Sequence, residues 1–351
     1  MKELRDGFTT GSAAAAAILA GYRYLTGGDM MPQEELILPG GVVLNIPVKT
    51  LPDGWFAVQK DAGDDPDVTD KCIVKVKVVR GGAAGAGDLV EDCGRGKLII
   101  HGGSGVGRVT RPGLAVAPGY PAINPGPRRI IKDNLMRMGF GEMDEVLTLE
   151  IAVENGEELA RKTLNPALGI VGGISILGNS GIVKPYSHAA YVDTIKLQCR
   201  AALAAGKIPG FASGRRSGDA LKRDFPMVEP IVSGDFIGEA VAAAVEAGAQ
   251  EIIVGCMPGK LFKYACGLKN THAHINPADM EQLRVFARQA GCDLPGNITT
   301  LGEAAALMPE ELYQSMLSII CRKADTVLNE WGGKMNVVVA VYNEIGERLP
   351  L

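Results

Sequence analysis

A glycine-rich stretch, residues 172–185 (GGISILGNSGIVKP), ends an apolar run in a turn of small residues, and a helical pattern opens near Ser187. Ligands of open α/β sheets bind where strands end, because backbone N–H groups and helix N-termini face that edge. Gly178 and Gly181 would let the backbone approach a bound molecule without an intervening Cβ. One interpretation is a nucleotide-like ligand; the other is a turn that needs glycine only for packing. The spacing is not the dinucleotide motif G-x-G-x-x-G.

Five aspartates crowd the segment 61–70 (DAGDDPDVTD). The run lacks the glutamate and the spacing of an EF-hand calcium loop. For Asp67 and Asp70 we favour a solvated acidic turn between strands. Carboxylates placed beside a polycarboxylate ligand are expected to have a raised pKa, and they could hydrogen-bond that ligand or transfer a proton.

The densest basic group of the N-terminal half consists of Arg108, Arg111, Arg128, Arg129 and Lys132. Arginine holds carboxylates through two parallel hydrogen bonds, so such a group suits a ligand with several carboxylates. Exposed ion pairs contribute only about 0–1 kcal/mol each, so several would have to act together. A solvated surface explains Arg129 and Lys132 equally well. Residues 102–107 (GGSGVG) lack the Lys-Ser/Thr of a phosphate loop, and we interpret them as a flexible loop on the substrate side.

Length and composition limit the protein class. A chain of 351 residues is long enough for two domains, and 46% hydrophobic with 22% charged residues is typical of a globular protein. A net charge of −4 argues against a nucleic-acid binder. The charged start has no secretory pattern, and the apolar run 13–20 is shorter than the roughly 20 residues of a membrane span. Seven cysteines without C-x-x-C pairs predict reduced thiols in a cytoplasmic protein, and the four histidines have no zinc spacing, so we expect no protein-bound metal.

The elements that must position these residues fall into two halves. We expect an α+β domain over residues 1–160, with helices at 12–25 and 127–138 and strands at 35–46, 55–60, 72–79, 97–101 and 145–153. Residues 161–351 alternate strand and helix, which predicts a Rossmann-like α/β domain with a mostly parallel sheet. Its strands are expected at 170–177, 227–232, 251–256 and 335–342, and its helices at 187–205, 236–247, 260–266, 277–289 and 310–331.

The glycine-rich stretch resembles the GISILG-(T/S)-TG-IV-x-P-x-S signature of the CbiD family, the cobalt-precorrin-5B C(1)-methyltransferases of anaerobic cobalamin synthesis. Six further segments resemble the same family in the same order, at residues 7–15, 61–69, 105–114, 121–128, 164–170 and 259–267. Together the seven segments span nearly the whole chain. One departure is the segment 208–219, where Pro209 and Gly210 weaken a central strand and to which we assign no ligand role.

The resemblance implies S-adenosylmethionine-dependent methylation of ring carbon 1 of cobalt-precorrin-5B, which gives cobalt-precorrin-6A. Cobalt would arrive only as part of this tetrapyrrole substrate. The N-terminal domain is the expected substrate side and the C-terminal domain the expected donor side. The oligomeric state stays open, a homo-oligomer included.

The resemblance also implies site residues. Those expected around S-adenosylmethionine are Gly178, Asn179, Ser180, Gly181, Asp235, Gly255, Met257 and Gly259. Those expected around the substrate are Thr9, Thr10, Ser12, Asp64, Asn124, Arg128, Lys260 and His272, and the proton-transfer candidates are Asp61 and Asp65. The turns at 178–181, 233–238 and 255–260 each follow an expected parallel strand, so we expect them to line one crevice.

Simpler roles compete with several of these assignments. Asp235 could be a helix N-cap, Lys260 a solvated residue of a first helical turn and His272 a buried, hydrogen-bonded histidine. For the whole protein, the alternatives are a nucleotide-dependent oxidoreductase that uses the same sheet edge and a non-catalytic corrinoid-binding protein.

Overall fold

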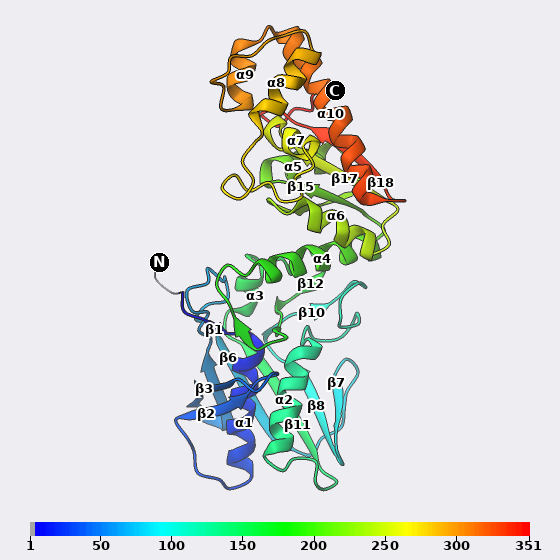
Figure 1. The fold of residues 1–351 in the computed structure, drawn as a ribbon. Helices are drawn as coiled ribbons and strands as arrows, with labels where there is room; N and C mark the ends of the chain where they lie inside the picture. The colour runs from blue at the N-terminus through cyan, green and yellow to red at the C-terminus, as the bar shows by residue number, and fades with distance from the viewer. Residues whose placement is uncertain (1–3) are drawn as a thin grey trace. The chain divides into compact units, whose positions relative to one another are not determined.

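The computed structural model describes residues 4–351 and divides the chain into two compact units, Met1–Ser187 and His188–Leu351 (Figure 1). Met1–Glu3, at the start of the charged N-terminal stretch, lie outside the described residues. The boundary therefore falls at residues 187–188 and not at 160–161. Among the described residues, no helix combines the length and the apolarity that crossing a bilayer requires.

The first unit is built on a six-stranded mixed sheet. Its strand order is β4 (Lys49–Thr50), β5 (Trp55–Gln59), β6 (Ile73–Arg80), β11 (Val146–Val153), β8 (Gly96–Gly102) and β7 (Leu89–Cys93). Only the β8–β11 pair is parallel. Helices α1 (Thr10–Leu25) and α2 (Pro125–Arg137) pack against the sheet and against each other. The α+β character expected of the N-terminal half is thus present.

Helix α1 begins at Thr10, two residues before the predicted start at residue 12, and ends at Leu25 as predicted. Thr9 is its N-cap and accepts a hydrogen bond from the backbone N–H of Ser12. The alanines 13–17 are completely buried in the core of this unit, because small side chains let the helix lie close to the sheet. A helix buried on so many sides needs partners for the free N–H groups of its first turn.

Short strand pairs surround the main sheet. They are β2 (Gln33–Ile37) with β3 (Val43–Pro47), β1 (Gly7–Phe8) with β14 (Ile182–Val183), β9 (Gly105–Val106) with β13 (Gly173–Ile174), and β10 (Arg108–Val109) with β12 (Ile170–Val171). The β2–β3 hairpin occupies the region that the sequence suggested as one strand at 35–46. A 3₁₀ turn, η1 (Pro52–Gly54), and the short helix α3 (Gly156–Ala160) complete the unit.

The apolar run 170–177 is not a strand of the C-terminal sheet, so that prediction is wrong. It forms β12 and β13, which pair with strands of the first unit, and Ile176 exchanges backbone hydrogen bonds with Ala122 and Asn124. The local pattern of a buried strand does not reveal which partner strand covers it. Residues 161–187 consequently belong to the first unit.

The second unit is built on a parallel four-stranded sheet. Its strand order is β16 (Val228–Val232), β15 (Ile208–Ala212), β17 (Glu251–Cys256) and β18 (Asn336–Val341). Its helices are α4 (His188–Ala204), α5 (Arg215–Asp224), α6 (Ile237–Glu246), α7 (Pro258–Ala265), α8 (Met280–Gln289), α9 (Leu301–Leu307) and α10 (Glu310–Gly332). The large apolar core forms between the sheet and helices α4, α6, α7 and α10, and a smaller one forms beside α5.

The segment 208–212, whose Pro209 argued against a central strand, is the interior strand β15. Ile208 donates its N–H to Met227, on the side of β16. Because successive N–H groups of a strand point in opposite directions, the missing donor of Pro209 faces β17. Pairing with β17 begins only at Gly210, so the proline interrupts no ladder bond.

Candidate functional site

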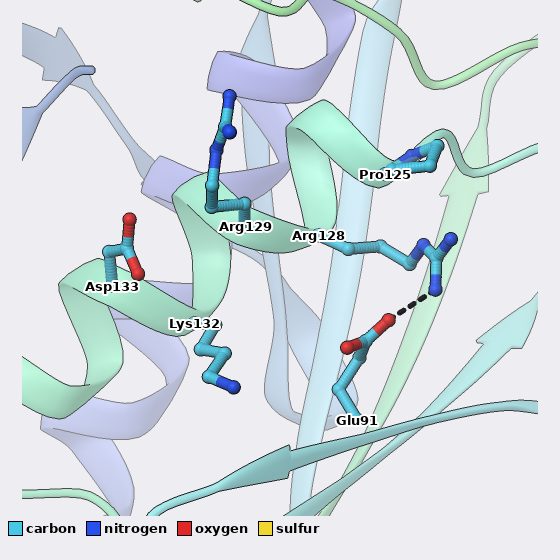
Figure 2. A pocket seen from close by; sticks show the side chains of 6 residues that line it. All are labelled: Glu91, Pro125, Arg128, Arg129, Lys132 and Asp133. Carbon is cyan, nitrogen blue, oxygen red and sulfur yellow. Dashed lines mark hydrogen bonds and ion pairs between the residues drawn. The ribbon is translucent and has the colours of Figure 1, made fainter.

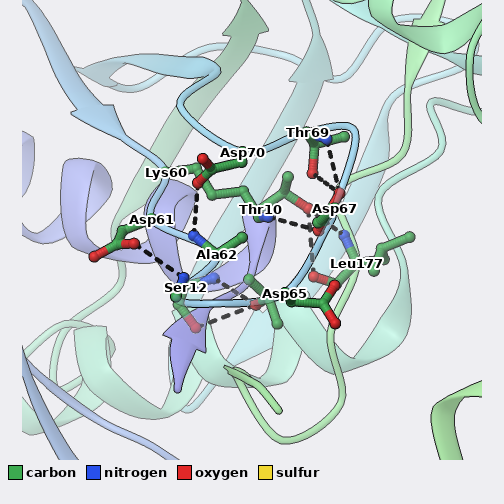
Figure 3. Close-up of polar contacts among 12 residues, drawn as sticks. Thr10, Ser12, Lys60, Asp61, Ala62, Asp65, Asp67, Thr69, Asp70 and Leu177 are labelled. Carbon is green, nitrogen blue, oxygen red and sulfur yellow. Dashed lines mark hydrogen bonds and ion pairs between the residues drawn. The ribbon is translucent and has the colours of Figure 1, made fainter. Parts of the chain in front are cut away.

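Segments far apart in the sequence meet at the N-terminus of α1. Thr9 donates its backbone N–H to the carbonyl of Gly181 at 3.0 Å, and the Ser12 hydroxyl donates to the same carbonyl at 2.7 Å. The Thr10 hydroxyl accepts from the N–H of Leu177 at 3.0 Å, and Gly11 donates to the Leu177 carbonyl (Figure 3). Residues expected at the substrate are thus brought together with the 177–181 turn expected at the donor.

The two glycines of this turn face the protein. Gly178 has a φ of 124° and Gly181 a φ of 82°, both in the region that favours glycine. A Cβ on Gly178 would collide with the Thr9 side chain, and one on Gly181 would collide with Leu38 and lie 2.8 Å from the Ser12 Oγ. The structure therefore favours the packing role for this turn. Because it lies in the first unit, it also cannot share the sheet edge with the turns that follow β16 and β17, as the sequence predicted.

The neighbours of these glycines complete the arrangement. Asn179 lies against Gly126 of α2, and the backbone N–H of Asn124 donates to Ile176 at 2.9 Å. The Ser180 hydroxyl bonds only the backbone of Ile182. Asn179 and Ser180 are exposed, so their side chains stay accessible to a ligand.

The aspartate loop 61–70 lies beside this hub, since Phe8 donates its N–H to the Asp61 carbonyl. The Asp61 carboxylate accepts from both terminal nitrogens of Arg5, at 2.5 and 2.7 Å, and this hydrogen bonding is the main reason that the pKa of Asp61 is lowered. Arg5 thus acts on the pKa of Asp61 in the direction opposite to the rise expected beside a polycarboxylate ligand, and that rise stays a prediction. Asp64 accepts from the Arg5 N–H and Asp65 from the Tyr186 N–H, each through one oxygen only.

A buried ion pair beneath this loop was not predicted. Lys60 is 2% exposed, and its ammonium donates to Asp67 at 2.7 Å (Figure 3). Burial would raise the pKa of Asp67, but the charge and hydrogen bond of Lys60 and the bonds from Thr69 outweigh it, and the pKa is lowered. Asp67 is therefore a structural counter-ion and not a solvated turn residue. The neighbouring residues in the sequence do not reveal whether a lysine at the end of a strand points into the protein or into solvent.

Arg128 lines a basic pocket on α2. The pocket measures about 370 Å³ and is lined by Glu91, Pro125, Arg128, Arg129, Lys132 and Asp133 (Figure 2). Arg128 forms an ion pair with Glu91 of β7, and its side chain is only 17% exposed. The predicted basic group is thus divided, because Arg108 bonds the carbonyl of Gly119 and does not line this pocket.

An Asp–His pair was also missed. His101, at the end of β8, contacts Asp88 through Nδ1 at 2.5 Å, and the second Asp88 oxygen accepts from the N–H of Gly85. Within residues 4–351, no hydrogen bond engages His101 Nε2, and the side chain is 36% exposed. The sequence signal is that His101 ends an apolar strand and is followed directly by the glycine-rich loop 102–107.

In the second unit, the turns after β16 and β17 do meet, as expected. Lys260 of α7 forms an ion pair with Asp235 and donates to the Thr271 hydroxyl at 2.7 Å, and that hydroxyl donates to Asp235 at 2.9 Å. Both contacts reach the same Asp235 oxygen, Oδ1. Burial opposes ionisation of Asp235, but these partners outweigh it and its pKa is lowered.

The other residues predicted in this unit have different positions. Met257 is the N-cap of α7 and half-buried, and Gly259 is exposed with open space around it. A Cβ on Gly255 would meet the Leu221 side chain at 2.6 Å, so Gly255 serves helix packing and not ligand approach. His272 is exposed and stacks near His274, so it is not the buried histidine considered as an alternative.

Lys263 is a further polar residue that the sequence did not single out. Its ammonium donates to the backbone carbonyls of Thr271 and Asn276, at 2.7 and 3.0 Å. Burial and then the nearby Lys260 lower its pKa. Lys263 thereby fixes the loop that carries Thr271. Across residues 4–351, no group of three or more His, Cys, Asp and Glu side chains is arranged to hold a metal ion.

Comparisons with known proteins agree with the resemblance. A model of the CbiD family matches residues 1–185, nearly the whole first unit. A protein of Citrifermentans bemidjiense named cobalt-precorrin-5B C(1)-methyltransferase is 37% identical over 97% of each chain, and one of Nitratidesulfovibrio vulgaris with the same name is 36% identical over 99% of this chain and 92% of its own. A crystal structure of the cobalamin biosynthesis protein CbiD of Archaeoglobus fulgidus is 28% identical and covers 75% of this chain and 80% of that chain, with a TM-score of 0.41. The chain belongs to the CbiD family.

We predict that Asp67→Asn destabilises the protein by about 3–5 kcal/mol, because it leaves the buried Lys60 without a counter-ion. The pKa of Asp67 is lower in the folded state than in the unfolded state. The contribution of Asp67 to stability is therefore complete above the unfolded-state pKa of about 3.9 and is lost as the pH falls through the folded-state pKa. Urea unfolding should be measured at neutral and acidic pH. The difference in the free energy of unfolding between wild type and Asp67→Asn should be smaller at acidic pH. Asp144→Asn, in the exposed pair with Arg95, is the control and should cost at most about 1 kcal/mol.

We predict that Gly181→Ala lowers the free energy of unfolding by more than Gly172→Ala does. Both glycines have a φ near 80°, so both variants carry the left-handed cost of about 1–2 kcal/mol. Only Gly181 faces side chains, which adds about 1–3 kcal/mol of overpacking, whereas nothing lies within 4 Å of a Cβ on Gly172. Equal unfolding midpoints in urea would contradict the packing role.

Proposed function

We propose that this protein transfers a methyl group from S-adenosylmethionine to ring carbon 1 of cobalt-precorrin-5B and so forms cobalt-precorrin-6A in cobalamin biosynthesis. The observation that carries the proposal is the match to a cobalt-precorrin-5B C(1)-methyltransferase over 97% of both chains. The protein is a methyltransferase, and its substrate is a tetrapyrrole.

The reaction requires little covalent chemistry from the protein. The methyl group is already activated on a positively charged sulfur, and the nucleophile is an electron-rich carbon of the macrocycle. Holding the sulfur, the methyl group and the carbon in line can lower the barrier by roughly 7–11 kcal/mol. The residues therefore have to bind and orient two ligands and accept one proton.

The proposed donor site is at the C-terminal ends of β15 and β17. The connection after β15 leads to β16 on one side and the connection after β17 leads to β18 on the other, so the crevice between β15 and β17 is the switch point of this sheet. Ser213 and Gly214 follow β15 there, and Met257 follows β17. The segment 208–219, to which the sequence assigned no ligand role, thus supplies part of this site.

Asp235 is the proposed polar anchor for the donor. Its Oδ1 is held by Lys260 and Thr271, whereas no hydrogen bond engages its Oδ2 within residues 4–351. A carboxylate fixed through one oxygen can accept from a hydroxyl or ammonium group through the other. The donor carries both groups. Lys260 accordingly acts on Asp235, and not directly on a substrate carboxylate as the sequence suggested.

His101 is the proposed proton acceptor. Methylation of a neutral carbon forms the new C–C bond, leaves the sulfur with the electrons of the broken S–C bond, and gives the macrocycle a positive charge that loss of a proton removes. Asp88 fixes His101 through Nδ1, and among the described residues Nε2 has no hydrogen-bond partner, which is the arrangement of an oriented base. Asp65 has one oxygen that no residue of the described range 4–351 engages, and it is the second candidate.

An anaerobic assay tests the function. The wild-type protein should move label from methyl-labelled S-adenosylmethionine into the tetrapyrrole of a cobalt-precorrin-5 preparation. Asp235→Asn should weaken S-adenosylhomocysteine binding at least about tenfold in calorimetry and leave the melting temperature near that of wild type. Glu246→Gln, an exposed carboxylate of α6 that pairs with Lys196, is the control with unchanged binding. Label transfer by wild type with unaltered donor binding by Asp235→Asn would move the donor site elsewhere, whereas reduction by a nicotinamide without label transfer would favour an oxidoreductase.

His101→Asn should reduce kcat by about 10²–10⁴-fold, the usual contribution of a general base, while binding of S-adenosylhomocysteine and the melting temperature stay near wild type. Asp88→Asn should give a smaller loss, because the imidazole remains but its orientation weakens. His274→Asn is the matched control on an exposed histidine and should leave kcat unchanged. A kcat for His101→Asn within threefold of wild type would exclude His101 and favour Asp65.

A further inference from the structure

Positively charged side chains lie close together in the pocket on α2, which suits an anionic ligand. Three of its six lining residues are cations and two are carboxylates. Its volume of about 370 Å³ suits one side chain of a large ligand better than a whole macrocycle. Pro125 lies at the first position of α2, where its fixed backbone angle starts the helix that carries the cations.

Arg128 uses only part of its hydrogen-bonding capacity. Its Nη1 donates to Glu91 Oε1, and its Nε is buried without a hydrogen-bond partner within residues 4–351. A guanidinium offers donors in a planar fork that matches the two oxygens of a carboxylate. An unpaired buried donor is unfavourable, so this nitrogen is an observation that points to a missing acceptor.

The neighbouring side chains show that the hydrogen-bond donors of Arg128 lie within the pocket. Arg128 and Lys132 are four residues apart on α2, and Figure 2 shows both extending toward the side of Glu91, while Arg129 and Asp133 point away from it. Glu91 belongs to β7, so the strand supplies the negative charge and the helix the positive charges. Glu91 thereby holds the Arg128 side chain in place.

We propose that this pocket binds one carboxylate side chain of the tetrapyrrole and that Glu91 competes with it for Arg128. The inference rests on the proposed function for the identity of the ligand and adds the group that is recognised. An incoming carboxylate accepts from the Arg128 fork and from Lys132, and it displaces Glu91 from Nη1. Glu91 orients the arginine in the free protein and lowers the affinity for ligands that lack the matching carboxylate.

The test uses the full chain and two cobalt corrinoids, cobyrinic acid with free carboxylate side chains and cobinamide with the same side chains as amides. Wild type should bind cobyrinic acid more tightly than cobinamide, measured by tryptophan fluorescence quenching. Arg128→Met should weaken cobyrinic acid binding at least about tenfold, and Lys132→Met should weaken it less. Arg137→Met is the matched control and should change nothing, because Arg137 is an exposed arginine of the same helix that does not line the pocket.

Glu91→Gln separates this proposal from a purely structural role of the ion pair. If Glu91 competes with the ligand, Glu91→Gln should bind cobyrinic acid at least about threefold more tightly than wild type. This gain in affinity should shrink as salt screens the charges. Weaker binding by Glu91→Gln, or equal effects of Arg128→Met and Arg137→Met, would overturn the proposal. Equal binding of the two corrinoids by wild type would overturn it too. Label transfer from S-adenosylmethionine by the same preparation shows that the proposed function stands independently of these outcomes.

Discussion

The buried start of α1 is the constraint on which the first unit depends. A helix whose first turns are covered must find partners for N–H groups that make no bond within the helix. Thr9 caps one of them, and the carbonyl of Leu177 accepts from Gly11. Because the acceptor comes from a segment more than 160 residues away in the chain, the helix and the 177–181 turn can only form together. A turn so tightly packed requires glycine where a Cβ would collide with the cap.

This constraint explains why family-like segments gather at one end of the first unit. The strands β9 and β10 pair with β13 and β12, and Asn124 at the start of α2 donates to Ile176. The aspartate loop joins through Phe8 and Asp61. Six of the seven family-like segments thus lie in the first unit, with 259–267 in the second, and the family model ends within two residues of the unit's boundary. Many of these residues, Gly178 and Gly181 among them, hold backbone segments together.

The sequence predicted the positions of helices and strands better than it predicted which segments and side chains contact one another. The helix after Thr9 and the parallel strand 251–256 were predicted almost to the residue, because caps and apolar periodicity are local signals. The run 170–177 was assigned to the wrong sheet, since its pattern fits any buried strand. The rejection of 208–212 failed because the position of Pro209 relative to β17 depends on register. The fold alone brings Lys60 to Asp67 and Asp88 to His101, so no local sequence pattern indicates either pair.

Unused hydrogen-bonding capacity distinguishes the structural charges from the functional candidates. Asp67 accepts through both oxygens from Lys60 and Thr69, and Asp61 accepts through both from Arg5, so each oxygen of these two carboxylates already has a partner. Asp235, by contrast, is held through one oxygen only, and Arg128 keeps a buried donor without a partner. Internal partners fix these two side chains in advance, which reduces the entropy lost on binding. The same ion pairs that stabilise the protein therefore orient the two side chains that we propose as ligand contacts, Asp235 for the methyl donor and Arg128 for a carboxylate.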